Sequence, residues 1–80
     1  ALGDGENPGR RNAAFEALVA MGPRATAPLL GAVGSPDVDV RKLAVDALAA
    51  IGDPEARDVL VRALGDRDAN VRAAAADALG

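Results

Sequence analysis

The sequence contains no cysteine and no histidine, and Phe15 is its only aromatic residue. These absences exclude disulfides, zinc sites with sulfur or nitrogen ligands, thiol nucleophiles and the usual catalytic triads. They also remove the aromatic platforms on which bases, sugars and flat cofactors stack. We therefore predict that the chain is not an enzyme and that it uses no metal or other cofactor.

Basic residues are scarce as well, because 9 Lys and Arg stand against 12 Asp and Glu, for a net charge of −3. A chain without electropositive excess is poorly suited to hold a phosphate backbone. No apolar run approaches the roughly 20 residues of a membrane span, and no signal-peptide pattern opens the chain. We expect a soluble, cytoplasmic protein that binds neither nucleic acid nor membranes.

Large apolar side chains are few. Alanine accounts for 20 of the 80 residues, while Leu, Ile, Val and Phe together account for 19. Such a composition still allows a packed core. Because alanine buries little side-chain surface, we expect stability to come from close approach of helices more than from large transfer energies.

What the sequence does contain is an internal repeat. Residues 37–48 recur 31 positions later as residues 68–79, with Asp, Val-Arg and Asp-Ala-Leu in matching places. Residues 7–22 align on residues 37–52 at an offset of 30. Non-alanine matches in one register argue against chance similarity within an alanine-rich chain. The repeats are predicted at about 7–36, 37–67 and 68–80.

Each repeat has the pattern of two helices joined by a turn. Asn7, Asp37 and Asp68 occupy N-cap positions of the first helices, and Asp53 occupies that of the middle repeat's second helix. Glycines at positions 22, 52 and 80 stand where a left-handed residue ends a helix. Pro28 belongs in a first turn, so we place the remaining N-cap at Thr26. The expected helices are 8–21, 27–33, 38–51, 54–64 and 69–79.

The apolar spacing of the middle repeat predicts its buried side. Val40, Ala44, Ala47, Leu48 and Ile51 follow the i, i+4, i+7, i+8, i+11 spacing of one helical stripe. A helix pair of this length cannot bury its stripe alone, so neighbouring pairs must stack. The predicted fold is all-α, an α-solenoid of antiparallel helix pairs with about two and a half repeats and five helices.

The repeat motif resembles the short HEAT-like repeats of the phycobilisome lyase type. It consists of a cap Asp followed by Val-Arg, then Ala-x-Asp-Ala-Leu, and then Ile-Gly-Asp-Pro-Glu-Ala. It is fullest over residues 37–65 and recurs over residues 68–80. The resemblance implies stacked helix pairs of a kind common in bacterial scaffolds. We interpret the chain as a non-catalytic scaffold module that presents a curved helical surface to another protein or domain. The alternative that the resemblance implies is a chromophore (bilin) lyase-type subunit or fragment.

Both ends of the sequence fall inside a repeat, since residues 1–3 match residues 63–65 and residues 68–80 supply only a first helix. We therefore expect residues 1–80 to be one segment of a longer array. The incomplete third repeat is expected to expose an apolar stripe through which the chain associates with its parent protein or with itself. That stripe comprises Val71, Ala75, Ala78 and Leu79.

In stacked helix pairs the second helices line the concave side, where repeat proteins usually hold partners. Arginines on that side could anchor a partner helix or an acidic segment. The alternative is that the same residues form only a solvated face. The candidate partner-binding residues are Thr26, Leu30, Gly31, Arg57, Asp58, Val61 and Arg62.

Charged residues also recur in register along the first helices. The i, i+5 spacing does not pair them within one helix, so contacts must run between adjacent repeats. We interpret them as a structural ladder, with a ligand-binding row as the alternative, because a guanidinium reaches a carboxylate or a helix-end carbonyl with several hydrogen bonds. The ladder residues are Arg11, Arg41, Arg72, Glu16, Asp46 and Asp77.

Overall fold

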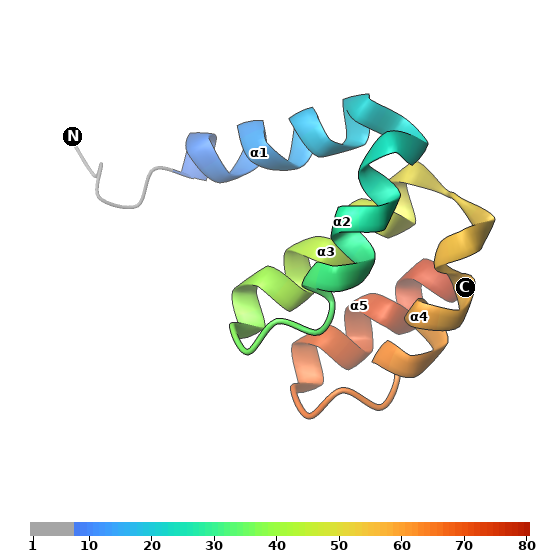
Figure 1. Ribbon diagram of the computed structural model, residues 1–80. Helices are drawn as coiled ribbons and strands as arrows, with labels where there is room; N and C mark the ends of the chain where they lie inside the picture. Colours follow the sequence, from blue (N-terminus) through green and yellow to red (C-terminus); the bar gives the residue numbers. More distant parts are fainter. Residues whose placement is uncertain (1–7) are drawn as a thin grey trace.

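The computed structural model describes residues 8–80, with side chains from residue 13 onward, and all regular structure in this part is helical (Figure 1). The all-α prediction is confirmed. No helix within the described residues is both long and apolar enough to cross a membrane. The α-helices are α1 (Pro8–Met21), α2 (Thr26–Ala32), α3 (Val38–Ile51), α4 (Arg57–Ala63) and α5 (Ala69–Leu79), and the short 3-10 helices η1 (Gly22–Ala25) and η2 (Pro54–Ala56) precede α2 and α4.

Three of the predicted N-caps are confirmed. The carboxylates of Asp37, Asp53 and Asp68 each accept a hydrogen bond from the backbone N–H two residues later, at 2.9, 3.0 and 2.8 Å. Each bond satisfies an amide that the first turn of a helix leaves unpaired. Asn7, predicted to cap the first helix, lies outside the described residues.

Thr26 does not cap α2, and this prediction is wrong. The chain is already helical through η1, so Ala25 precedes α2 with right-handed backbone angles and makes no side-chain cap. Thr26 is instead buried, and its hydroxyl donates a 2.9 Å hydrogen bond to Asp53 Oδ2. The threonine therefore joins the second helix of one repeat to the turn of the next.

α3 lies at the centre of the fold. It packs most extensively against α5, then against α2 and α1, while α4 packs against α5 (Figure 1). α1 packs against α3 less extensively than α5 does, and it reaches away from the other helices (Figure 1). First helices of successive repeats are thus neighbours, as the 31-residue period requires.

The core is built mainly from alanine, as the composition predicted. Six of the eleven buried apolar residues are alanines, and the largest fully buried apolar side chains are Leu48, Val45 and Val71. Small side chains let the helix axes approach closely, so backbone atoms and methyl groups supply much of the packing. The packing at the α3–α5 contact therefore tolerates little added volume.

The predicted stripe of α3 needs one correction. Ala44, Ala47 and Leu48 are buried, but Val40 is 37% exposed and the adjacent Arg41 is buried instead. Val40 lies in the first turn of α3, which α1 leaves partly uncovered (Figure 1). Arg41 is turned toward the loop before α5, where Asp66 is its partner.

The expectation of an exposed stripe on α5 is also wrong in part. Val71 and Ala75 are fully buried, because α5 packs these residues against α3 and α4. Ala78 and Leu79 are half-buried. The side of α5 that remains open is a different one, and it carries Arg72 and Ala76.

Gly52 ends α3 with φ at +74°, in the left-handed region predicted for it, and Gly22 ends α1 with φ at +63°. A methyl group added at Gly52 meets nothing within 4 Å. Gly52→Ala is therefore expected to lower the free energy of unfolding by about 1–2 kcal/mol through backbone strain alone. Urea denaturation followed by circular dichroism measures the change.

Gly31 is the matched control, because it lies inside α2 and a methyl group added there also meets nothing within 4 Å. Gly31→Ala is expected to raise the free energy of unfolding by up to about 1 kcal/mol, since alanine favours the helix. Equal effects of the two substitutions would contradict this account of Gly52.

Candidate partner-binding surface

A buried arginine connects the two loops at which successive repeats join. Arg41 is 5% exposed, and its Nε donates to Asp66 Oδ2 at 2.9 Å while its Nη2 donates to Asp66 Oδ1 at 3.3 Å. Its Nη1 donates to the backbone carbonyls of Ser35 and Pro36, at 2.9 and 3.3 Å. The guanidinium thus connects the loop before α3 to the loop before α5.

Asp66 is the centre of this network. Burial raises the pKa of its carboxyl, but the Asp68 amide and the Arg41 guanidinium outweigh that effect, and the pKa lies below its usual value. Its backbone carbonyl accepts a 2.9 Å bond from Arg72 Nη1. Both arginines therefore converge on one loop residue.

The structure does not pair the arginines of the predicted ladder with its acidic residues. Arg41 and Arg72 each donate to the carbonyl of the residue six positions earlier, Ser35 or Asp66. Asp46 pairs instead with Lys42 at 2.9 Å on an exposed face. Glu16 and Asp77 are exposed, and the side chain of Arg11 lies outside the described part.

Asp66 was missed because the repeat pattern conceals it. Its counterpart 31 residues earlier is Ser35, so no carboxylate recurs at this position. The sequence does show that Ser35 and Asp66 are both polar and that each stands two positions before a cap, Asp37 or Asp68. That signal is weak, since polar residues are common in any loop.

The candidate partner-binding residues do not form one surface. Thr26 is buried, whereas Gly31, Asp58 and Val61 are exposed. Arg57 and Arg62 are both exposed but five positions apart on α4, which turns them about 140° from each other. The two arginines accordingly line different grooves.

One groove lies between α2 and α4, the two second helices. Leu30 and Arg62, two of the candidate residues, lie in this α2–α4 groove. Its other side chains are mainly aliphatic, and Asp66 also lines it. The full lining is Leu30, Val33, Gly34, Val59, Arg62, Ala63 and Asp66.

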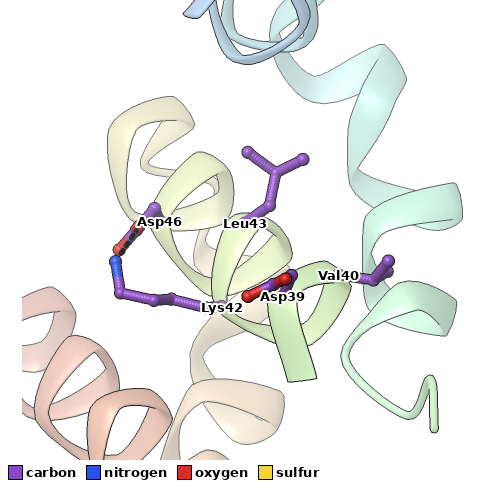
Figure 2. A pocket seen from close by; sticks show the side chains of 5 residues that line it. All are labelled: Asp39, Val40, Lys42, Leu43 and Asp46. Atoms are coloured by element: carbon purple, nitrogen blue, oxygen red, sulfur yellow. Dashed lines mark hydrogen bonds and ion pairs between the residues drawn. The ribbon is translucent and has the colours of Figure 1, made fainter. Parts of the chain in front are cut away.

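A second groove runs along α3, where the Lys42–Asp46 ion pair stands on one side and Val40 on the other, with Leu43 between them (Figure 2). The grooves have volumes of about 220 to 260 Å³. Sites that enclose a small molecule usually measure about 300–1,000 Å³. These grooves therefore suit side chains of a protein partner better than an enclosed ligand.

Within residues 8–80 no cluster of three potential metal ligands occurs.

Comparison with known proteins identifies the family. A family model of HEAT repeats matches residues 26–80, which is more than half of the chain. The chain therefore belongs to the HEAT repeat family, and this part of the predicted resemblance is confirmed. No curated protein and no solved structure shows a significant match.

The Arg41–Asp66 pair should dominate the response of this region to mutation. Arg41→Ala leaves a buried carboxylate without its cation and is expected to cost about 3 kcal/mol of unfolding free energy. Arg72→Ala, at the equivalent exposed position, removes one bond and should cost less than about 1 kcal/mol. Urea denaturation at neutral pH measures the free energy of unfolding of both variants. Equal losses of unfolding free energy would show that Arg41 is not the organising residue.

Asp66 should also contribute to the pH dependence of stability. Its folded pKa lies below the ordinary value of 3.8, so the folded state binds the proton more weakly than the unfolded state does. This contribution is present above the unfolded pKa and is lost as the pH falls from about 4 through the folded pKa. Asp66→Asn should therefore lower unfolding free energy most at neutral pH and least near pH 3, in urea titrations at several pH values. A deficit independent of pH would contradict the assignment.

Proposed function

We propose that the chain is a non-catalytic protein-interaction module, a short stretch of α-solenoid whose α2–α4 groove receives a partner. HEAT repeats generally mediate protein interactions. The observation that carries the proposal here is the groove itself, because it opens between the two second helices and pairs aliphatic side chains with one exposed arginine. Such a mixture of apolar contact area and one charged anchor is typical of protein-binding sites.

The chemistry of the groove indicates the kind of partner. Leu30, Val33 and Val59 offer apolar contacts, and Arg62 stands at the exposed edge. Asp66 is already held by Arg41, so the positive charge of Arg62 remains the main polar anchor for an incoming segment. We infer that the partner contributes a helix or extended segment with aliphatic side chains and a carboxylate placed to meet Arg62.

The sizes of the grooves favour this module over a bilin lyase subunit. A groove of about 260 Å³ is smaller than the roughly 300–1,000 Å³ of sites that enclose a small molecule. Histidine and cysteine, which supply most nucleophiles and acid–base groups, are absent from the sequence. Binding through aliphatic side chains and one arginine requires neither.

The groove is tested by affinity capture with the immobilised chain. Arg62→Glu reverses the charge at the edge of the groove and is expected to weaken capture of the partner at least tenfold, since the anchor then repels a carboxylate. Arg24→Glu is the matched control, because Arg24 is an equally exposed arginine on η1, away from this groove.

Bound proteins are identified and quantified by mass spectrometry. The proposal requires at least one protein that the unmodified chain and Arg24→Glu retain and that Arg62→Glu loses. Identical capture by all three chains would remove the α2–α4 groove as the binding surface.

A further inference from the structure

Two residues of the sequence carry a hydroxyl group, and they differ in accessibility. Thr26 is 2% exposed, and its hydroxyl is bound to Asp53. Ser35 is half-buried in the loop between α2 and α3, next to the exposed residues Gly34 and Pro36. Phosphorylation modifies the hydroxyls of serine, threonine and tyrosine, and the sequence has no tyrosine. Ser35 is therefore the one accessible acceptor for a phosphoryl group.

The next repeat shows what an anion does at this place. Asp66 stands 31 positions after Ser35, in the loop before α5. Ser35 Oγ accepts a hydrogen bond from the Asp37 amide at 3.1 Å. Asp66 Oδ1 accepts the equivalent bond from the Asp68 amide at 2.9 Å. Asp66 makes one contact more, the ion pair with Arg41 of the preceding first helix, and an uncharged hydroxyl forms no such pair.

α1 is the first helix that precedes the loop of Ser35, and the repeat places an arginine on it. Arg11 stands 30 positions before Arg41, which is the offset between the first two repeats. The side chain of Arg11 lies outside the described part, so the sequence register alone assigns this position. The junction between the first two repeats thus has an arginine at the place of Arg41 and a serine at the place of Asp66. An acidic group is what this junction lacks.

We propose that Ser35 is phosphorylated and that its phosphate pairs with Arg11, as Asp66 pairs with Arg41. In the transfer, Ser35 Oγ bonds to the terminal phosphorus of ATP, which a protein kinase supplies. The bond from that phosphorus to the oxygen of ADP breaks, and a base of the kinase takes the hydroxyl proton. The phosphate carries a charge of about −1.5 to −2 and three acceptor oxygens, which suit a bidentate bond with a guanidinium.

The loop before α5 shows that this turn accepts two anions two positions apart. Asp66 and Asp68 have this spacing before α5, and Ser35 has the same spacing from the cap of α3. The pKa of Asp66 lies below its usual value, because the Asp68 amide and the Arg41 guanidinium outweigh the effect of burial. The folded chain therefore favours the ionised carboxylate there. A phosphate on Ser35 meets the same setting when Arg11 is beside it.

The proposed pair changes how α1 lies on α3. In the unmodified chain α1 packs against α3 less extensively than α5 does and reaches away from the other helices (Figure 1). Val40, in the first turn of α3, is accordingly 37% exposed. A bond between the phosphate before α3 and Arg11 in the N-terminal half of α1 draws these two helices together and covers Val40. Phosphorylation therefore closes the junction between the first two repeats.

The first test compares the chain phosphorylated at Ser35 with the unmodified chain by hydrogen exchange. Exchange of the α1 amides is expected to slow about tenfold, since the new ion pair must break before α1 opens. Arg11→Ala should abolish this slowing. Arg10→Ala is the matched control, because the neighbouring position on α1 is turned by about 100°. It removes the same charge and should leave the slowing in place.

Two substitutions test the charge without a phosphate. Ser35→Asp reproduces Asp66 in the repeat register and should also slow exchange of the α1 amides, in a manner that Arg11→Ala removes. Ser35→Asn is the control, because its side-chain oxygen can still accept the Asp37 amide bond but carries no charge. Ser35→Asn should leave the exchange of α1 unchanged.

Acceptance of the phosphoryl group is measured separately. The folded chain is incubated with ATP and a proline-directed protein kinase, because Pro36 follows Ser35. Mass spectrometry of the digested chain should find phosphate on Ser35 and none on Thr26, and Ser35→Ala should abolish incorporation. A peptide of residues 31–40 serves as the unfolded control.

Three results would overturn the proposal. One is a folded chain that takes up no phosphate on Ser35. Another is an exchange rate of α1 that phosphorylation leaves unchanged. The third is a slowing that Arg11→Ala does not remove or that Arg10→Ala removes equally, because the phosphate then acts without the proposed pair. Ser35 does not line the α2–α4 groove and these tests need no partner, so their failure leaves the proposed function untouched.

Discussion

The contact between Arg41 and Asp66 ties α3 to the two loops at which successive repeats join, one before α3 and one before α5. A buried ion pair stabilises a fold only when further hydrogen bonds satisfy both ions, and here the carbonyls of Ser35 and Pro36 and the amide of Asp68 do so. Arg41 of α3 and four loop residues, Ser35, Pro36, Asp66 and Asp68, are thereby held in a single geometry. The hydrogen bond between Thr26 and Asp53 fastens the second helix of one repeat to the next repeat in the same way.

These polar contacts matter because the apolar core specifies so little by itself. Alanine faces are nearly smooth, so helices that meet through them can slide or rotate with small changes in buried area. Among the residues whose side chains the structure describes, Val45, Leu48 and Val71 are the largest apolar ones that are fully buried. Directional bonds from Arg41 and Thr26 supply the register that close packing of methyl groups leaves open.

The same arrangement leaves a groove between the second helices of two repeats. The α2–α4 groove is lined by Leu30 of α2 and by Val59 and Arg62 of α4. It exists only because α2 and α4 lie next to each other in the fold, so residues about 30 positions apart in the sequence line one surface.

The sequence by itself determined the first helices of the repeats, three Asp caps and the repeat period, because each depends on residues close together along the chain. It did not predict that 3-10 helices precede α2 and α4, so that the expected helix over residues 54–64 is divided into η2 and α4. The predictions from sequence were wrong about Thr26 and Val40 and missed the role of Asp66, and the three errors have one physical reason. Whether Thr26 caps a helix or Val40 is covered depends on which helices pack beside it, and Ser35 at the place of Asp66 hid the partner of Arg41. Only the tertiary structure decided these points, since α3 meets α1 loosely and α5 tightly although all three share one pattern.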